Sequence, residues 1–338
     1  MKGERQQDGF RNNEERPLKY SAGEQDGYGI SREMAGRFNR TYFSRTDNQP
    51  AFLVLREGGD DRRTAAAGGS AAVGPCLVRS EEWLLRPELA ALYNTWINSE
   101  DGSEADRGLQ RIYYMLRSAA AGLLESSDGS WVAVTLPFTD ELSRQPSRLA
   151  ALQDVQLEAL FTALGERHLQ GSDSRVDLLA PYPASGAEFA AMREFVETVA
   201  EQTLGHAYAA ACRIGALIAP DAVHAAEEIG RIADFLVLDG AAGGPAPEHD
   251  AAAEGFALAA GQILAAVRRV KPAAVVLAAG APAVAALADL YLIGLNGIFC
   301  SADQRTEALL RAACLTWMAR HETVEPAGGV TQVRGYRA

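Results

Sequence analysis

The sequence has little that would mark a secreted, membrane-spanning or metal-binding protein. Its cysteines stand far apart, without a Cys-x-x-Cys pair, at Cys76, Cys212, Cys300 and Cys314. This spacing argues against a zinc site and provides no disulfide framework. No apolar run reaches the roughly 18 residues that a membrane-spanning helix needs, and the first 17 residues lack the apolar core of a secretory signal. We therefore expect a reduced, cytoplasmic protein.

An excess of basic residues is also missing. The formal net charge is −12 and the sequence pI is near 5.0, which disfavours nucleic acid or an anionic membrane surface as the main partner. Charged residues make up 22% of the chain and hydrophobic residues 48%. A chain of 338 residues with this composition can bury the core of one large domain or two small ones.

Aliphatic residues are scarce in residues 1–48, which are rich in Gln, Asn, Arg, Glu, Asp and Gly. Such a segment cannot bury enough apolar surface to offset the entropy lost on ordering. We expect a largely flexible extension there, with Ile30 to Phe43 able to form a short docked helix. The folded domain is expected over residues 49–322, followed by a tail at 323–338.

From residue 51 onward, short apolar runs alternate with amphipathic helical stretches, which is typical of βα units. Eight such units in residues 51–320 fit a (β/α)8 TIM barrel, whose usual size is about 250 residues. A doubly wound open sheet is the alternative, and it is less favoured because no Gly-x-Gly-x-x-Gly follows the first strand. The expected strands are 51–55, 75–78, 131–136, 175–180, 213–219, 235–238, 273–278 and 297–300.

A charged cluster directly follows the second expected strand. It consists of Arg79, Ser80, Glu81 and Glu82. Because parallel α/β folds place ligand chemistry at the carboxyl ends of their strands, this cluster is a candidate site by its position.

The same stretch resembles a known family. Gly74, Arg79, Ser80, Glu81 and Leu84, after a Gly-Ala-rich step, are similar to the second strand of the C-terminal barrel of phosphoenolpyruvate-utilising enzymes. These include enzyme I of the sugar phosphotransferase system, pyruvate phosphate dikinase and phosphoenolpyruvate synthase. The resemblance covers residues 51–320 and implies a barrel that holds a phosphorylated 2-oxo acid with arginines and Mg²⁺.

The resemblance also implies that the active site is degenerate. Glu158 stands where the family has an arginine, and Ile218 or Ala219 stands where it has a metal-binding glutamate. Residues 239–242 lack the family's asparagine and second metal carboxylate, and no cysteine follows the seventh strand. The resemblance thus implies no catalytic residue, no metal site and no cofactor here, with one arginine of the constellation remaining.

The candidate ligand-binding residues are Arg79, Glu81, Tyr182 and Asp239. Arg79 and Glu81 could hold a ligand or pair with each other or a neighbouring loop. Asp239 could bind a metal or a ligand hydroxyl, or cap the turn beside Gly240. Tyr182, between two prolines, is expected to line the barrel opening.

These observations favour a non-catalytic binding or regulatory module for a small anion or a protein partner, which could form a homodimer. The first alternative is an active phosphotransferase or lyase acting on phosphoenolpyruvate, pyruvate or a related 2-oxo acid. The second is a structural or assembly protein. The barrel fold does not decide among them, because one fold hosts many chemistries.

Overall fold

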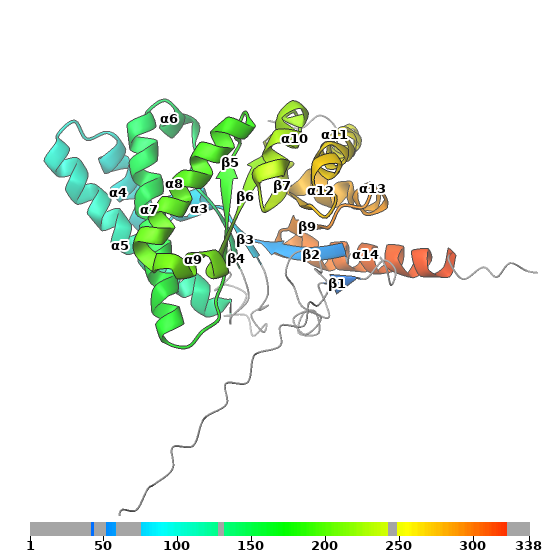
Figure 1. Ribbon diagram of the computed structural model, residues 1–338, viewed down its shortest axis with the longest axis horizontal. Coiled ribbons are helices and arrows are strands. Elements are labelled where there is room, and N and C mark those ends of the chain that lie inside the picture. Colours follow the sequence, from blue (N-terminus) through cyan, green and yellow to red (C-terminus); the bar gives the residue numbers. More distant parts are fainter. Residues whose placement is uncertain (1–41, 44–51, 59–75, 128–131, 243–248, 323–338) are drawn as a thin grey trace, which may run out of the picture.

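A computed structural model describes residues 42–43, 52–58, 76–127, 132–242 and 249–322. Its centre is a closed barrel of eight parallel strands, in which each strand pairs with the next and the last pairs with the first (Figure 1). The strands are β2 (Phe52–Glu57), β3 (Cys76–Val78), β4 (Val132–Thr135), β5 (Val176–Pro181), β6 (Cys212–Ile218), β7 (Phe235–Asp239), β8 (Val275–Ala279) and β9 (Gly297–Cys300). The predicted TIM barrel is confirmed, and the open-sheet alternative is wrong because β2 pairs with β9.

The strands are apolar on both faces because both faces are buried. Their inward side chains fill the barrel with a packed core of Leu53, Leu55, Leu77, Ala133, Leu179, Leu217, Phe235, Val237, Val275, Leu277, Ala279 and Phe299. Their outward side chains join a second and larger core beneath the helices. The barrel interior is therefore a core rather than a channel, and polar chemistry is confined to its ends.

Helices surround the barrel, as Figure 1 shows, and α14 extends away from the rest of the ring. The longer ones are α4 (Pro87–Ile97), α5 (Gly102–Ser126), α7 (Pro146–Leu169), α8 (Gly186–Leu204), α10 (Val223–Ile232), α11 (His249–Val270) and α14 (Ala302–Glu322). Shorter helical segments are α3 (Ser80–Leu84), α6 (Asp140–Ser143), η1 (Gly205–Ala207), α9 (Tyr208–Ala211), α12 (Ala281–Ala285) and α13 (Leu287–Leu292).

Local sequence explains where several helices begin. Proline occupies the first helical position of α4 and α7, where a missing backbone N–H costs nothing. The side chains of Asp101, Thr139 and Ser185 accept hydrogen bonds from the first-turn backbone of α5, α6 and α8.

The structure differs from the sequence prediction in a few places. Tyr42–Phe43 forms a short strand, β1, antiparallel to β2, where the end of a helix was expected. The single helix expected after β8 is divided at Ala286 into α12 and α13. The rest of the predicted extension, the Gly-Ala-rich step that follows the first expected strand and the predicted tail lie outside the described residues.

Candidate functional site

The carboxyl-terminal mouth of the barrel is the end at which all eight parallel strands finish. Side chains alternate along a strand, so the last inward positions line this mouth. Glu57 follows the inward Leu53 and Leu55 on β2, and Arg79 follows the inward Leu77 on β3. Asp239 is the last residue of β7 and is fully buried.

Arg79 is bound by two carboxylates at this mouth. Its Nε donates to Glu57 Oε1 at 2.7 Å, while Nη1 and Nη2 donate to the two oxygens of Asp239 at 2.7 and 2.8 Å. The relative exposures of the side chains are 19% for Arg79, 15% for Glu57 and 0% for Asp239. This two-point arginine–carboxylate geometry is the strong form of the interaction. Arg79 is therefore not an open anion receptor.

The environment fixes the charges of this pair. Burial by itself would raise the pKa of the Asp239 carboxyl, but the hydrogen bonds and charge of Arg79 outweigh burial and hold that pKa below its ordinary value. Burial would likewise lower the pKa of the Arg79 guanidinium, but Asp239 and Glu57 raise it. Both groups remain ionised.

Tyr182 completes the network from the loop after β5. Its hydroxyl donates to Asp239 Oδ2 at 2.5 Å, and its backbone N–H donates to Leu217 O at 2.8 Å. Burial, then the neighbouring Asp239, raises the pKa of this phenol. Among the described residues, Tyr182 alone combines a side chain with a positive φ, 47°. A non-glycine residue is held in this conformation only where its surroundings determine it.

Glu81 does not pair with Arg79, so that predicted alternative is wrong. Glu81 lies on α3 and accepts hydrogen bonds from Phe138 N at 2.9 Å and Thr135 Oγ1 at 3.2 Å. It thereby holds the end of β4 and the loop that follows. Burial raises the pKa of the Glu81 carboxyl despite these hydrogen bonds. The exposed Glu82 beside it also has a raised pKa, from desolvation and then from the charge of Glu57.

Asp239 caps the turn after β7, as one of its predicted roles, because its Oδ1 accepts from Ala241 N at 2.9 Å. Its carboxylate also binds Arg79 and Tyr182, and its role in binding a ligand stays a prediction. The structure thus brings together three predicted residues, Arg79, Tyr182 and Asp239, and places Glu81 in a separate cluster.

Two members of the site were missed in the sequence. Glu57 was left outside the first expected strand, 51–55, although β2 continues to that residue. Its position two residues beyond Leu55 on an alternating strand is the signal that could have found it. Thr135, the partner of Glu81 and of Ser80 N at 3.0 Å, was hidden within an apolar run.

The described residues contain no cluster of three or more His, Cys, Asp or Glu side chains placed to hold a metal ion. The chain has three lysines, and the one in the described part, Lys271, lies at the opposite end of the barrel and donates to Ala233 O at 2.7 Å. None of the described helices has both the length and the apolar character needed to cross a bilayer.

No family model matches the chain, and no curated protein matches it either. Among solved structures, it is similar to an HpcH/Hpal aldolase/citrate lyase family protein from Burkholderia cenocepacia J2315. That match has 18% identity and a TM-score of 0.41, and covers 80% of this chain and 94% of the other. It is also similar to a structure described as native KDPGal, with 14% identity and a TM-score of 0.33. That match likewise covers 80% of this chain and 94% of the other. These values concern the fold alone.

The comparisons correct one prediction. The resemblance to the barrel of phosphoenolpyruvate-utilising enzymes is wrong, because the similar solved structures named above are an aldolase/citrate lyase family protein and KDPGal rather than members of that family. The quoted similarities were those of layout, which many βα barrels share.

Proposed function

We propose that this barrel is a non-catalytic binding module whose carboxyl-terminal mouth recognises a small molecule with an ammonium or guanidinium group. One observation carries the proposal, namely that the guanidinium of Arg79 is already bound by Asp239 and Glu57. The mouth therefore offers a ligand hydrogen-bond acceptors on carboxylates rather than a free guanidinium donor.

An anion would have to displace carboxylates from Arg79. Asp239 has no exposed surface, so removing its partner would leave a buried charge without compensation. Breaking a buried pair in this way costs about 3–5 kcal/mol. A small carboxylate or phosphate makes up for that loss only by rebuilding every hydrogen bond, and it would still repel the displaced groups.

A cation meets no such obstacle. Glu57 accepts from Arg79 Nε and from Gly280 N at 3.3 Å, and a carboxylate offers about four acceptor positions. The exposed Glu82 adds a further carboxylate, close enough to Glu57 for the two charges to repel each other. The raised pKa of Glu82, caused by desolvation and then by its acidic neighbours, reflects an unfavourable crowding of negative charge. A bound cation would relieve that crowding.

The non-catalytic part of the proposal rests on how the polar groups are held. A general acid or base works best with a pKa near the ambient pH. The pKa of Asp239 lies below its ordinary range because Arg79 overcomes the effect of burial, and the pKa of Tyr182 is raised by burial and by Asp239. Both shifts move these two groups away from proton exchange at neutral pH. The pKa of Glu81 is raised by burial, but its carboxyl is held by Phe138 N and Thr135 Oγ1 rather than turned towards Arg79.

Thermal unfolding of the full chain at constant ionic strength tests the proposal, with agmatine as the cationic probe and pyruvate as the anionic one. We expect agmatine to raise the midpoint temperature and to be recovered chemically unchanged. Glu82→Gln should reduce that rise, and because it removes one of the crowded negative charges the unliganded variant should be at least as stable as the wild type. Glu158→Gln, which removes an exposed carboxylate on α7, is the matched control and should leave the rise intact.

Two outcomes would refute the proposal. One is an absence of any agmatine effect on the midpoint temperature. The other is an effect of the same size in the Glu82→Gln variant, which would place the cation elsewhere. Conversion of agmatine would refute the non-catalytic part alone.

A further inference from the structure

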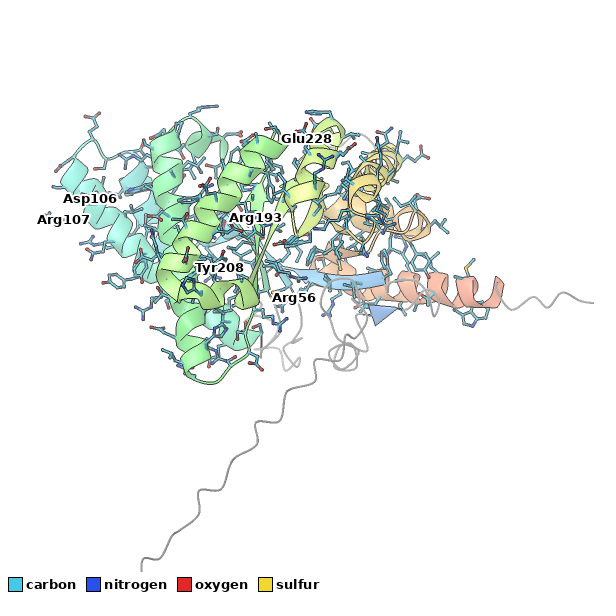
Figure 2. The ribbon with its side chains drawn as sticks, viewed as in Figure 1. Arg56, Asp106, Arg107, Arg193, Tyr208 and Glu228 are labelled. Carbon is cyan, nitrogen blue, oxygen red and sulfur yellow. The ribbon has the colours of Figure 1, made fainter. Side chains whose placement is uncertain are left out.

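An arginine interrupts the apolar outer face of the first barrel strand. Phe52 and Val54 point outward from β2 into the core beneath the helices, and the next residue on that face is Arg56. Strand register places Arg56 directly between Cys76 on β3 and Cys300 on β9. Figure 2 labels Arg56 at this end of β2. Both flanking cysteines are buried.

A second arginine lies over the same patch. Arg305 is in the first turn of α14, which follows β9 after one residue and packs against β2 and β9. The electrostatic surroundings of Arg305 include both Cys300 and Arg56. Two guanidinium groups are therefore held near each other between three neighbouring strands and a helix.

Neither arginine has its charge compensated within the described part of the chain. The Nε atoms of Arg56 and Arg305 are both buried and without a hydrogen-bond partner, and neither side chain forms a salt bridge to a described carboxylate. A buried donor without a partner loses roughly 1–3 kcal/mol in desolvation, more when it is charged. Like charges placed together add to that cost.

The neighbouring thiols cannot supply the missing negative charge. Burial raises the pKa of the Cys300 thiol to about 12, although Arg305 opposes the shift. Burial likewise raises the pKa of the Cys76 thiol, with Arg56 opposing. Both cysteines are neutral at physiological pH, and the pKa of Arg305 is lowered by burial and then by the charge of Arg56.

We infer that Arg56 and Arg305 form a binding site for a phosphate-type oxyanion on the outer wall of the barrel, between the ends of β2 and β9 and the start of α14. A dianion balances the two guanidinium charges, and its oxygens accept from both unpaired Nε atoms. The start of α14 adds the partial positive charge of a long helix, which also favours an anion. Inorganic phosphate and a phosphate monoester share this chemistry.

This site is separate from the mouth and does not rest on the proposed cation. The side chain of Arg56 lies on the outer face of β2, whereas that of Glu57 lies on the inner face and belongs to the mouth. The two sites therefore respond to different variants.

Isothermal titration of the full chain with inorganic phosphate, at constant ionic strength in a chloride background, tests the inference. We expect saturable binding that weakens by roughly tenfold or more in Arg56→Met and in Arg305→Met, since each variant loses a charge-assisted donor. Arg107→Met removes an exposed arginine from α5 (Figure 2) and should bind like the wild type. Glycerol phosphate is the second arm, and tighter binding than inorganic phosphate would identify a monoester as the ligand.

Thermal unfolding in phosphate-free buffer keeps the inference testable if a variant is too unstable to titrate. There Arg305→Met should be at least as stable as the wild type, because it removes one of two neighbouring like charges that no described carboxylate balances. Arg305→Lys keeps the positive charge but cannot donate the paired hydrogen bonds of a guanidinium, so it should bind phosphate more weakly than the wild type. Absence of saturable binding, equal binding in the Arg56, Arg305 and Arg107 variants, or unfolding of Arg305→Met in phosphate-free buffer would overturn the inference.

Discussion

Asp239, fully buried at the end of β7, accepts hydrogen bonds from both terminal nitrogens of Arg79. Arg79 follows β3 and lies 160 residues earlier in the chain. This pair crosses the mouth of the barrel and joins strands that are not neighbours in the sheet. Glu57 on β2 and Tyr182 after β5 extend it, so four elements meet in one network.

Arg79→Ala should therefore destabilise the protein rather than merely remove a ligand contact. The variant leaves the Asp239 carboxylate buried without its partner, which costs about 3–5 kcal/mol in the free energy of unfolding. Urea denaturation followed by circular dichroism measures the loss. The double variant Arg79→Met with Asp239→Leu removes both charges and should recover much of it.

Arg107→Ala, on the exposed face of α5, serves as the control and should change the free energy of unfolding by less than about 0.5 kcal/mol. A loss in Arg79→Ala no larger than in this control would mean that water or another group replaces the guanidinium, and would contradict the structural role of the pair.

Much of the fold could be predicted from the sequence. Strands such as Phe235–Asp239 are short apolar runs buried on both faces, and they alternate with helices that begin at proline or at a capping side chain. These signals are local, so they are readable without knowing the partner strand. Closure of the barrel through β2 and β9 followed from the number of units rather than from any residue.

The site could be predicted only in part. Arg79, Tyr182 and Asp239 were found because each lies at the carboxyl end of a strand. The hydrogen bonds among them could not be predicted from the sequence, because these depend on which inward positions face each other across the barrel. Glu81 stands only two residues after Arg79, yet the partners of Arg79 come from β2 and β7 while Glu81 hydrogen-bonds to Thr135.

Gly297→Ala should disrupt the seam at which the barrel closes. Gly297 on β9 is in register with Leu53 on β2. A Cβ at this glycine would lie 2.7 Å from the Cβ of Leu53 and would also collide with the backbone carbonyl oxygen of Leu53. Backbone on both sides must then shift, so we expect a loss beyond the 1–3 kcal/mol that is usual for overpacking.

The measurement is the urea midpoint together with near-ultraviolet circular dichroism, which reports side-chain packing. Gly261→Ala is the matched control, because a Cβ there meets nothing within 4 Å on α11. This control should be neutral or slightly stabilising, since alanine is the better helix former. Equal stability of the two variants would contradict the tight closure of β2 against β9.

The last prediction concerns the pH dependence of stability at the mouth, where the pKa values of two carboxyl groups are shifted in opposite directions. The pKa of Asp239 is held below its ordinary value of 3.8 because Arg79 outweighs burial. Its contribution is therefore present above about pH 4 and is lost as the pH falls through the lowered pKa. The pKa of Glu81 is raised above 4.5 by burial. As the pH rises from 4.5 through the raised pKa, folded Glu81 must release a proton that the unfolded chain has already lost, so stability falls.

Glu81→Gln isolates the second effect, because it keeps a side-chain oxygen for Phe138 N and cannot ionise. We expect the wild type and the variant to approach each other in free energy of unfolding near pH 4.5, with the wild type becoming relatively less stable as the pH rises to 8. Urea denaturation at several pH values in this range, with Glu158→Gln as the control, gives the difference directly. A difference that is constant with pH, or that grows in favour of the wild type, would mean that Glu81 is stabilised as a carboxylate and that its hydrogen bonds to Phe138 and Thr135 outweigh its burial.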